Sequence, residues 1–561
     1  MVRLSGARAL VESLKREKVD IVFGYPGGAI IPVYDELKDS GIRHILARHE
    51  QCAAHMADGY ARVSRRVGVV MATSGPGATN LVTGIATAHL DSSPVVAITG
   101  QVPTTLLDTD AFQEADVPGI FNPIAKYVFQ PRSASEVPHS VKAAFYLAST
   151  GRTGPVVVDV PKDVQTKVED MSFPDKVSVR GYIPYVEPDS TAVARAAEIL
   201  LSAEKPILLS GGGVKRSCAE DVLLALANYF MLPVVTTFMG KGSFPEDHVL
   251  SMGTIGMHGT YQANTLITEA DVIISFGARF SDRSTMDVNG FTNRKKVVQF
   301  DIDPTEVGKN IEPTEFVIGD LKRSMTMFYE EVKKRAIAKK DSPWLKRAIS
   351  LKQEYDEKIF GNNGDGELRS PKIIKKIREV LPSESIVTTE VGQNQMWAKL
   401  YFKVSQQGLF ITSGGLGTMG FGFPAAIGAK AAKPYVPVLD IAGDGSFQMT
   451  SNSLATSVTE NLPVIVCILN NSSLGLVAQW QRTFYNKRCY ATWLGSTPDF
   501  VKFAHAFGAE GVRVQSLDEL DRALRQALKC EVTTIIDIPI SPEEDVLPFV
   551  PAGGSLKDML V

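Results

Sequence analysis

The residues with the clearest chemical potential are Gly443-Asp444-Gly445-Ser446 and Asn470-Asn471. Each group follows an apolar stretch of strand length, and 27 positions separate Asp444 from Asn471. A carboxylate, an amide oxygen and a loop carbonyl are hard donors that suit Mg2+ and a phosphate-bearing ligand. The glycines let the backbone approach a diphosphate, and a following helix would offer its N-terminus to the anion. Taken singly, GDG is only a turn and NN only a loop, but together they predict a metal–diphosphate site.

Neighbouring parallel strands are needed to bring Asp444 and Asn471 together. Their spacing fits one strand–helix–strand crossover, and parallel sheets bind ligands at the carboxyl ends of their strands. Short apolar strands alternate with helical stretches along the chain, which predicts an α/β fold of doubly wound parallel sheets. The expected strands include Gly68–Ala72, Val95–Thr99, Val156–Val160, Ile207–Ser210, Val272–Phe276, Val297–Ile302, Val436–Ile441 and Val464–Leu469.

Two polar stretches interrupt this alternation and divide the chain into three units. The second stretch is expected to form an exposed, lysine-rich helix followed by the loop GNNGDGE at 361–367. The N-terminus is expected to be an amphipathic helix capped by Ser5, leading into a strand over Asp20–Gly24. The boundaries expected are domains over 1–170, 191–335 and 371–541, linkers over 171–190 and 336–370, and an irregular tail over 542–561.

The composition excludes several classes of protein. The chain is 44% hydrophobic and 22% charged, and its net charge of −3 offers no basic surplus for a nucleic-acid partner. The five cysteines contain no CxxC pair, which argues against a structural zinc site and a disulfide framework. No apolar run approaches the roughly 18–20 residues that span a bilayer, and the N-terminus lacks a signal peptide's apolar core. A soluble, cytoplasmic protein with no membrane partner is expected.

The stretch GDGSFQMTSNSLATSVTENLPVIVCILNN, from Gly443 to Asn471, resembles the signature of thiamine-diphosphate-dependent enzymes. The resemblance implies a pyrimidine-binding domain, a central FAD-binding, Rossmann-like domain and a diphosphate-binding domain. It also implies that Mg2+ is bound by Asp444, Asn471 and the backbone carbonyl of Ser473. Further cofactor contacts are implied for Gly392, Gln393, Gly443, Gly445 and Ser446.

Thiamine chemistry also needs a carboxylate to activate the coenzyme's pyrimidine ring. The candidate is Glu50 in RHEQ, although a glutamate in a first helical turn is also favoured by the helix dipole alone. The surrounding VFGYPGGAIIPVYDEL and RHEQCAAHMADGYAR resemble the family's first domain. In the glycine-rich SGGLGTMG, the resemblance implies that Met419 holds the coenzyme bent and that the Gly417 carbonyl accepts a hydrogen bond from it. A core methionine at a tight turn is the alternative for Met419.

Further stretches resemble the acetohydroxyacid (acetolactate) synthase family. Phe112 and Gln113, in TDAFQEAD, would line the active site, and the alternative is a polar loop with a core Phe. Trp480, in LGLVAQWQ, would contact the ethyl group of 2-ketobutyrate, and the alternative is a core aromatic. Glu390 and Asn394 depart from the family's common Asp and His. The residues expected to bind FAD are Arg152, Gly211, Gly212, Gly213, Met257, His258, Gly277, Arg279, Arg283, Asp301, Ile302 and Asp320.

This resemblance implies a specific reaction. Pyruvate would be decarboxylated on thiamine diphosphate, and its hydroxyethyl unit joined to pyruvate or 2-ketobutyrate, giving the precursors of valine, leucine and isoleucine. FAD would be mainly structural because the ligation needs no redox step. The family completes its site from two subunits, which implies a homodimer or homotetramer, and a small regulatory subunit is typical. The alternatives are a catabolic acetolactate synthase, a pyruvate oxidase and a non-catalytic nucleotide-binding module.

Overall fold

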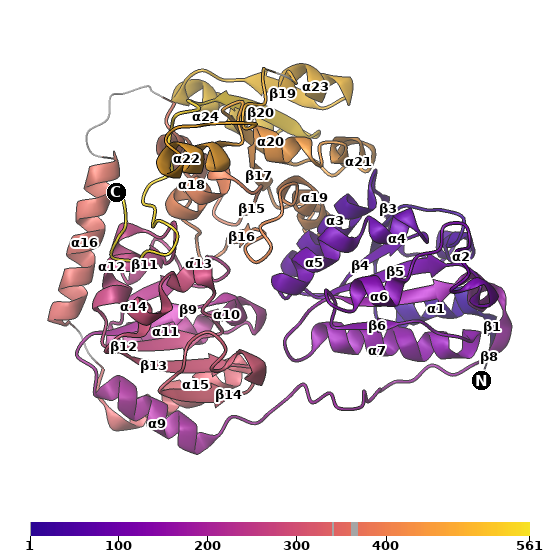
Figure 1. Ribbon diagram of the computed structural model, residues 1–561, viewed down its shortest axis with the longest axis horizontal. Helices are drawn as coiled ribbons and strands as arrows, with labels where there is room; N and C mark the ends of the chain where they lie inside the picture. The colour runs from indigo at the N-terminus through magenta and orange to yellow at the C-terminus, as the bar shows by residue number, and fades with distance from the viewer. Residues whose placement is uncertain (1, 339–340, 361–367, 497) are drawn as a thin grey trace.

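The computed structural model describes residues 2–338, 341–360, 368–496 and 498–561. Within them, three six-stranded parallel sheets follow one another along the chain, and helices flank each sheet (Figure 1). The predicted α/β class with three doubly wound domains is therefore confirmed. No helix in these ranges is both long and apolar enough to cross a membrane. The predicted loop at 361–367 lies outside the described residues.

The first sheet has the strand order β3-β2-β4-β5-β7-β6. Its central strands are buried along their whole length, as expected for a parallel sheet covered on both faces. The strands are β2 (Ile21–Gly24), β3 (Arg43–Leu46), β4 (Gly68–Ala72), β5 (Val95–Gln101), β6 (Tyr127–Phe129) and β7 (Val156–Pro161).

The second and third sheets have the orders β11-β10-β9-β12-β13-β14 and β16-β15-β17-β18-β20-β19. In each, the chain starts near the middle of the sheet and moves first to one edge and then to the other, which is the doubly wound pattern. The second comprises β9 (Pro206–Ser210), β10 (Val234–Thr236), β11 (Ser251–Thr254), β12 (Val272–Phe276), β13 (Lys296–Asp301) and β14 (Glu315–Ile318). The third comprises β15 (Ile386–Thr389), β16 (Leu409–Ile411), β17 (Val438–Gly443), β18 (Ile465–Asn470), β19 (Glu510–Arg513) and β20 (Thr534–Pro539).

The N-terminus differs from the prediction of a helix alone. Residues Val2–Ser5 form strand β1, which pairs antiparallel with β8 (Val168–Met171), and helix α1 covers Gly6–Arg16. The predicted cap is present, because the Ser5 hydroxyl accepts a hydrogen bond from the Arg8 backbone N–H at 3.2 Å. After β8, an extended segment runs to α9 (Ser190–Leu201) in the second unit (Figure 1).

The lysine-rich stretch after α15 (Leu321–Arg335) forms a helix, as predicted, but this helix is less exposed than predicted. Helix α16 covers Pro343–Phe360, and it is not simply exposed: Trp344 and Leu351 are buried against the second unit. The Trp344 indole N–H donates to the Pro206 carbonyl at 2.9 Å. The helix packs against the second unit because its apolar residues recur at helical spacing and form one face, although most of its residues are polar.

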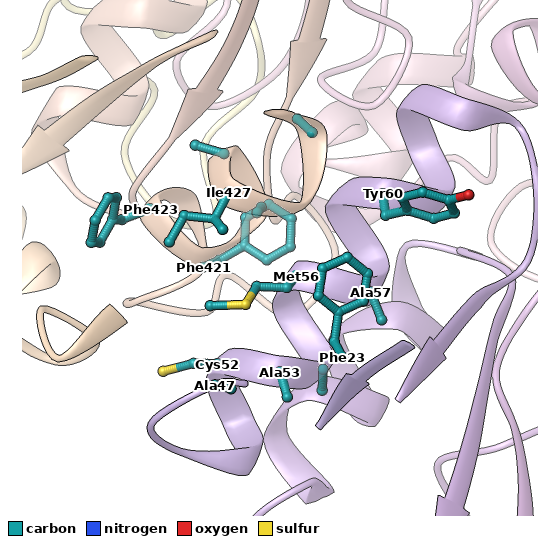
Figure 2. Close-up of a cluster of buried hydrophobic side chains, with 14 of the residues drawn as sticks. Phe23, Ala47, Cys52, Ala53, Met56, Ala57, Tyr60, Phe421, Phe423 and Ile427 are labelled. Carbon is teal, nitrogen blue, oxygen red and sulfur yellow. The ribbon is translucent and has the colours of Figure 1, made fainter. Parts of the chain in front are cut away.

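The first and third units pack through helices α3 (Glu50–Ser64) and α19 (Gly422–Ala432). One hydrophobic core runs through both, and Figure 2 shows Met56 of α3 beside Phe421 at the start of α19. The helices approach closely because each has a glycine at the contact. A Cβ added at Gly428 would lie 1.9 Å from the Met56 carbonyl oxygen, and one at Gly59 would lie 2.2 Å from that of Ala425.

Replacing Gly428 by Ala is expected to destabilise the protein, because the new methyl would meet backbone that cannot rotate away. Overpacking of this kind costs about 1–3 kcal/mol, and more where backbone must move. The midpoint of urea denaturation measures the effect. Gly28→Ala is the control, because a Cβ there meets nothing within 4 Å. Equal midpoints for the two variants would show that the helices can separate freely.

Candidate active site

The predicted metal ligands lie at the carboxyl ends of neighbouring strands. Strand β17 ends at Gly443 and pairs in parallel with β18, which ends at Asn470. Asp444 opens helix α20 (Asp444–Gln448), and both Asp444 and Asn471 are buried. The strand–helix–strand crossover predicted from their spacing is thus present, and it brings the carboxylate and the amide to one edge of the sheet.

Hydrogen bonds fix the orientation of the Asn471 side chain. Its Nδ2 donates to Oε1 of Gln393 at 3.0 Å, and its Oδ1 accepts from the Ser473 N–H at 3.1 Å. Gln393 is held in turn, because its Nε2 donates to Oε1 of Gln479 and to the Glu544 carbonyl, both at 3.0 Å. These hydrogen bonds therefore hold the amide oxygen of Asn471 in one position.

Burial raises the pKa of Asp444 to about 6, against backbone N–H groups that lower it. A buried carboxylate of this kind is stabilised by a cation beside it. The oxygens of Asp444, Asn471 and the Ser473 carbonyl are the hard donors that Mg2+ prefers, and they sit beside Gly443 and Gly445. The residues present therefore fit a Mg2+–diphosphate group.

A buried glutamate, Glu390, ties the loops of this site together. One carboxylate oxygen accepts from the Gly420 N–H at 2.7 Å and from the Ser446 hydroxyl at 2.6 Å. The other accepts from the Phe423 N–H at 2.9 Å. Glu390 thus joins the loop that carries Met419 to the GDGS loop. Sequence reasoning noted this residue only as a departure from the family, although its position directly after β15 could have indicated the same sheet edge.

A second buried carboxylate, that of Asp440, lies near Glu390. Asp440, in β17, is fully buried, and its Oδ1 accepts from the Thr388 hydroxyl at 2.9 Å. Burial and the charge of Glu390 raise the pKa of Asp440, and burial raises the pKa of Glu390. The backbone N–H groups and the Ser446 hydroxyl that donate to Glu390 lower its pKa and so offset part of the effect of burial there.

The glycine-rich loop lies against the first unit. The Gly415 N–H donates to Asp91 at 2.7 Å, and the hydroxyls of Thr418 and Thr87 are 2.6 Å apart. Gly417 has a φ of +72°, which favours glycine at this exposed turn. Met419 is half-buried, so it is not a core methionine.

Glu50 is the first residue of α3 and is buried. Its carboxylate accepts from Nδ2 of Asn80 at 2.9 Å. A Cβ added at Gly77 would lie 3.4 Å from Oε1 of Glu50, so a glycine keeps the space beside the carboxylate open. Burial, and then the Glu50 charge, raise the pKa of the nearby Tyr34.

Phe112 and Gln113 lie on a loop of the first unit. The Phe112 side chain is 89% exposed, which rules out the alternative of a core phenylalanine. Gln113 has a φ of +60°, and its backbone lies against Gly75. Two cavities in the described part of the chain, of about 990 and 740 Å3, are lined by neither Glu50, Phe112 and Gln113 nor Asp444 and Asn471.

A large central cavity does bring together the residues expected to bind FAD. It has a volume of about 740 Å3, within the range of cofactor pockets. Gly211, the one expected residue that does not line it, packs so closely that an added Cβ would lie 2.0 Å from the Gly277 carbonyl oxygen. The expected residues that do line it are Arg152, Gly212, Gly213, Met257, His258, Gly277, Arg279, Arg283, Asp301, Ile302 and Asp320.

Unpaired groups in the central cavity fit a large polar ligand. Within the described residues, neither ring nitrogen of the buried His258 has a hydrogen-bond partner, and Arg279 forms no ion pair. Arg152 instead contacts Glu306 at 2.7 Å and Asp303 at 3.2 Å. Burial raises the pKa of Asp301 to about 6. Cations, acids and a glycine-lined wall in one cavity suit a dinucleotide such as FAD.

The same cavity is lined by Gly417, predicted to contact the coenzyme, and by Trp480, predicted to contact the acceptor substrate. Trp480 lies on helix α22 (Gly475–Phe484), is half-buried, and its indole N–H has no partner among the described residues. Its neighbour Gln479 is buried and accepts from the Val546 N–H at 3.0 Å. Trp480 therefore lines the central cavity from a fixed helix and is not a core aromatic.

Comparison with known proteins assigns all three units. Residues 4–120, 193–328 and 390–538 match the N-terminal, central and C-terminal domains of thiamine pyrophosphate enzymes, the first and last being the TPP-binding ones. A probable acetolactate synthase large subunit of Methanocaldococcus jannaschii is 47% identical, over 99% of this chain and 95% of its own. The acetolactate synthase large subunits of Parasynechococcus marenigrum and Haemophilus influenzae are 44% and 39% identical, over 99% and 100% of this chain and 91% and 99% of theirs. The chain belongs to the thiamine pyrophosphate enzymes and, among them, to the acetolactate synthase large subunit family.

Proposed function

We propose that this chain is an acetolactate synthase, which decarboxylates pyruvate and joins the two-carbon unit to pyruvate or 2-ketobutyrate. The observation that carries the proposal is the placement of Asp444 and Asn471 at one sheet edge. The glycine-rich loop, which Glu390 joins to this edge, lines the central cavity together with Trp480. The relatives' names agree with it. The products would be 2-acetolactate and 2-aceto-2-hydroxybutyrate.

We propose Mg2+ and FAD as further cofactors beside thiamine diphosphate. Asp444, Asn471 and the Ser473 carbonyl would hold Mg2+, and the central cavity would hold FAD. When bound, thiamine diphosphate supplies a nucleophilic carbon that attacks keto acids and then accepts electrons. The flavin would be structural, because carbon–carbon ligation transfers no net electrons.

Each chain residue then has a defined task. Glu50 would hydrogen-bond the pyrimidine ring and exchange the proton that activates the coenzyme. Met419 and the Gly417 carbonyl would hold the pyrimidine, while the backbone at Gly443, Gly445 and Gly392 would leave room for the diphosphate. Ser446 acts indirectly, because its hydroxyl is engaged by Glu390. Phe112 and Gln113 would contact the substrate.

We propose that two copies of the chain complete each active site. Glu50, Phe112 and Gln113 line neither the cavity of about 990 Å3 nor that of about 740 Å3 in their own chain, and Phe112 is almost fully exposed. A two-fold dimer could place these residues opposite the Asp444 edge of the partner, and the same surface would serve both copies. The relatives are named large subunits, so we also propose a separate small regulatory subunit as a partner.

The reaction is tested by incubating the purified protein with pyruvate, with and without thiamine diphosphate and Mg2+. Acid converts acetolactate to acetoin, which a colour assay detects. Acetoin that depends on both additions supports the proposal. Acetate formation linked to oxygen or quinone would instead identify a pyruvate oxidase, and turnover by a protein that never binds FAD would identify a catabolic synthase.

Replacing Trp480 by Leu is expected to reduce the preference for 2-ketobutyrate over pyruvate as acceptor. The indole would contact the additional methylene, and one methylene in an apolar pocket is worth about 1–3 kcal/mol, or roughly 10–200-fold. The measurement is the product ratio when both keto acids compete. Tyr435→Leu, at a 98% exposed aromatic residue in the same unit, is the control. An unchanged ratio for Trp480→Leu would remove the residue from acceptor selection.

A further inference from the structure

A second large cavity lies where the three units meet, and we call it the junction cavity. Its volume is about 990 Å3, and its walls come from the end of α3, from α10 (Gly212–Arg216) and from residues 406–412 around β16. Arg216, Phe238 and Met239 line both this cavity and the central cavity, so the two lie back to back. None of the residues assigned above to thiamine diphosphate, Mg2+ or FAD lines the junction cavity.

Two adjacent cations in this cavity are held by backbone carbonyls alone. Nζ of Lys215 donates to the carbonyls of Lys241 at 3.1 Å and Phe410 at 3.0 Å. Nε of Arg216 donates to the Ser92 carbonyl at 2.8 Å, and Nη1 to that of Gly212 at 3.2 Å. Burial lowers the pKa of Lys215 to about 8 and that of Arg216 to about 10, with cation–cation repulsion adding to both.

Most other basic residues of the cavity are paired with carboxylates, whereas Lys18 and Lys433 form no ion pair within the described residues but are exposed to solvent. Arg62 pairs with Asp58 and Asp91 at 2.6 and 2.9 Å, and Lys322 pairs with Asp221 at 3.0 Å. Arg65 and Arg66 likewise each contact a carboxylate. Within the described residues, Lys215 and Arg216 form no such pair. The carboxylates of Glu220 and Glu246 near Lys215, and of Asp91 and Asp58 near Arg216, offset the cost of confining these cations only in part. The two cations therefore suit an anion.

The wall near these cations is apolar and aromatic. Phe410 and Phe238 lie with ring centroids 6.5 Å apart, and Phe145 and Met239 also line the cavity. An inorganic anion would leave this wall and most of the volume unused. We infer that the junction cavity binds a nucleotide, with its phosphates at Lys215 and Arg216 and its base against the aromatic wall. The volume is at the upper end for small-molecule sites.

The test uses the protein saturated with thiamine diphosphate, Mg2+ and FAD, so that the sites proposed above are already filled. ADP is titrated by calorimetry and is expected to bind in a 1:1 ratio with each chain, without releasing FAD. Lys215→Met should weaken the binding at least tenfold, which equals about 1.4 kcal/mol. Lys322→Met is the matched control, because that lysine lines the same cavity but already has a carboxylate partner.

Two further titrations, with adenosine and with inorganic phosphate, show which part of ADP the cavity binds. Adenosine and inorganic phosphate are each expected to bind more weakly than ADP, because each meets only one part of the site. Phosphate that binds as tightly as ADP would overturn the nucleotide assignment, and ADP that displaces FAD would place the binding in the central cavity. If Lys215→Met and Lys322→Met weaken ADP binding equally, the effect comes from the overall charge of the cavity, and the proposed role of Lys215 is wrong.

A labelling experiment on the unchanged chain covers the case in which Lys215→Met does not fold. Acetic anhydride at pH 8 acetylates lysines with lowered pKa values, and mass spectrometry quantifies acetylation at Lys215 and, for reference, at Lys433 on the same cavity. ADP is expected to slow acetylation of Lys215 at least threefold more than that of Lys433. Equal rates with and without ADP would contradict the proposed site.

Discussion

Replacing Glu50 by Gln is expected to lower kcat by roughly 10²–10⁴-fold while leaving the fold intact. The amide keeps the size of the side chain and a hydrogen bond with Asn80, but it cannot exchange the activating proton. Steady-state acetoin formation measures kcat, and the thermal midpoint verifies the fold. Glu12→Gln, at a surface position on α1, is the control. A Glu50→Gln protein with ordinary turnover would eliminate this carboxylate from the mechanism.

A mixing experiment also tests the proposed two-chain site. Co-expressed Glu50→Gln and Asp444→Asn chains would form mixed dimers in which one site carries both changes and the other carries neither. With random pairing, about a quarter of the sites would be intact, as two-fold symmetry requires. Activity near that level is expected, although each variant alone is nearly inactive. A mixture no more active than the separate variants would mean that one chain supplies both residues.

Replacing Asp444 by Asn is expected to weaken Mg2+-dependent binding of thiamine diphosphate by at least roughly 100-fold, because a direct ligand should matter more than an outer-shell group. Tryptophan fluorescence during Mg2+ titration at fixed thiamine diphosphate measures the affinity. Asp518→Asn, at an exposed position on α24 (Leu517–Ala527), is the control.

The same Asp444→Asn change should not reduce the stability of the cofactor-free protein at neutral pH. Burial raises the pKa of Asp444 above its ordinary value, so the folded state disfavours the charge and its cost grows as pH rises between those two values. Removing the charge removes that cost. Lost coenzyme affinity with a retained unfolding midpoint identifies a ligand, whereas loss of both would indicate a structural role.

Local sequence patterns were sufficient for the parts of the fold that depend on local physics. Strands such as Gly68–Ala72 and Val272–Phe276 are continuous apolar runs bounded by helices, and the structure places them at those residues. The strand β1 was not predicted, since it exists through pairing with β8, about 165 residues away. No periodicity within Val2–Ser5 contains that information.

The candidate site likewise contains some residues that the sequence could predict and others that it could not. Asp444 and Asn471 could be found because one crossover fixes their spacing along the chain. The role of Glu390 could not, because its partners Gly420, Phe423 and Ser446 come from three separate segments. The raised pKa of its buried neighbour Asp440 likewise depends on packing and has no sequence signature.

The Glu390 carboxylate also bears on how a coenzyme enters this protein. A single side chain fastens the glycine-rich loop to the start of α20, so the two loops hold each other in place through protein contacts alone. Less association free energy is then lost to ordering these loops, which favours tight binding of the coenzyme. This part of the coenzyme site is thus formed when one chain folds, and the contacts proposed for a second chain are added on assembly.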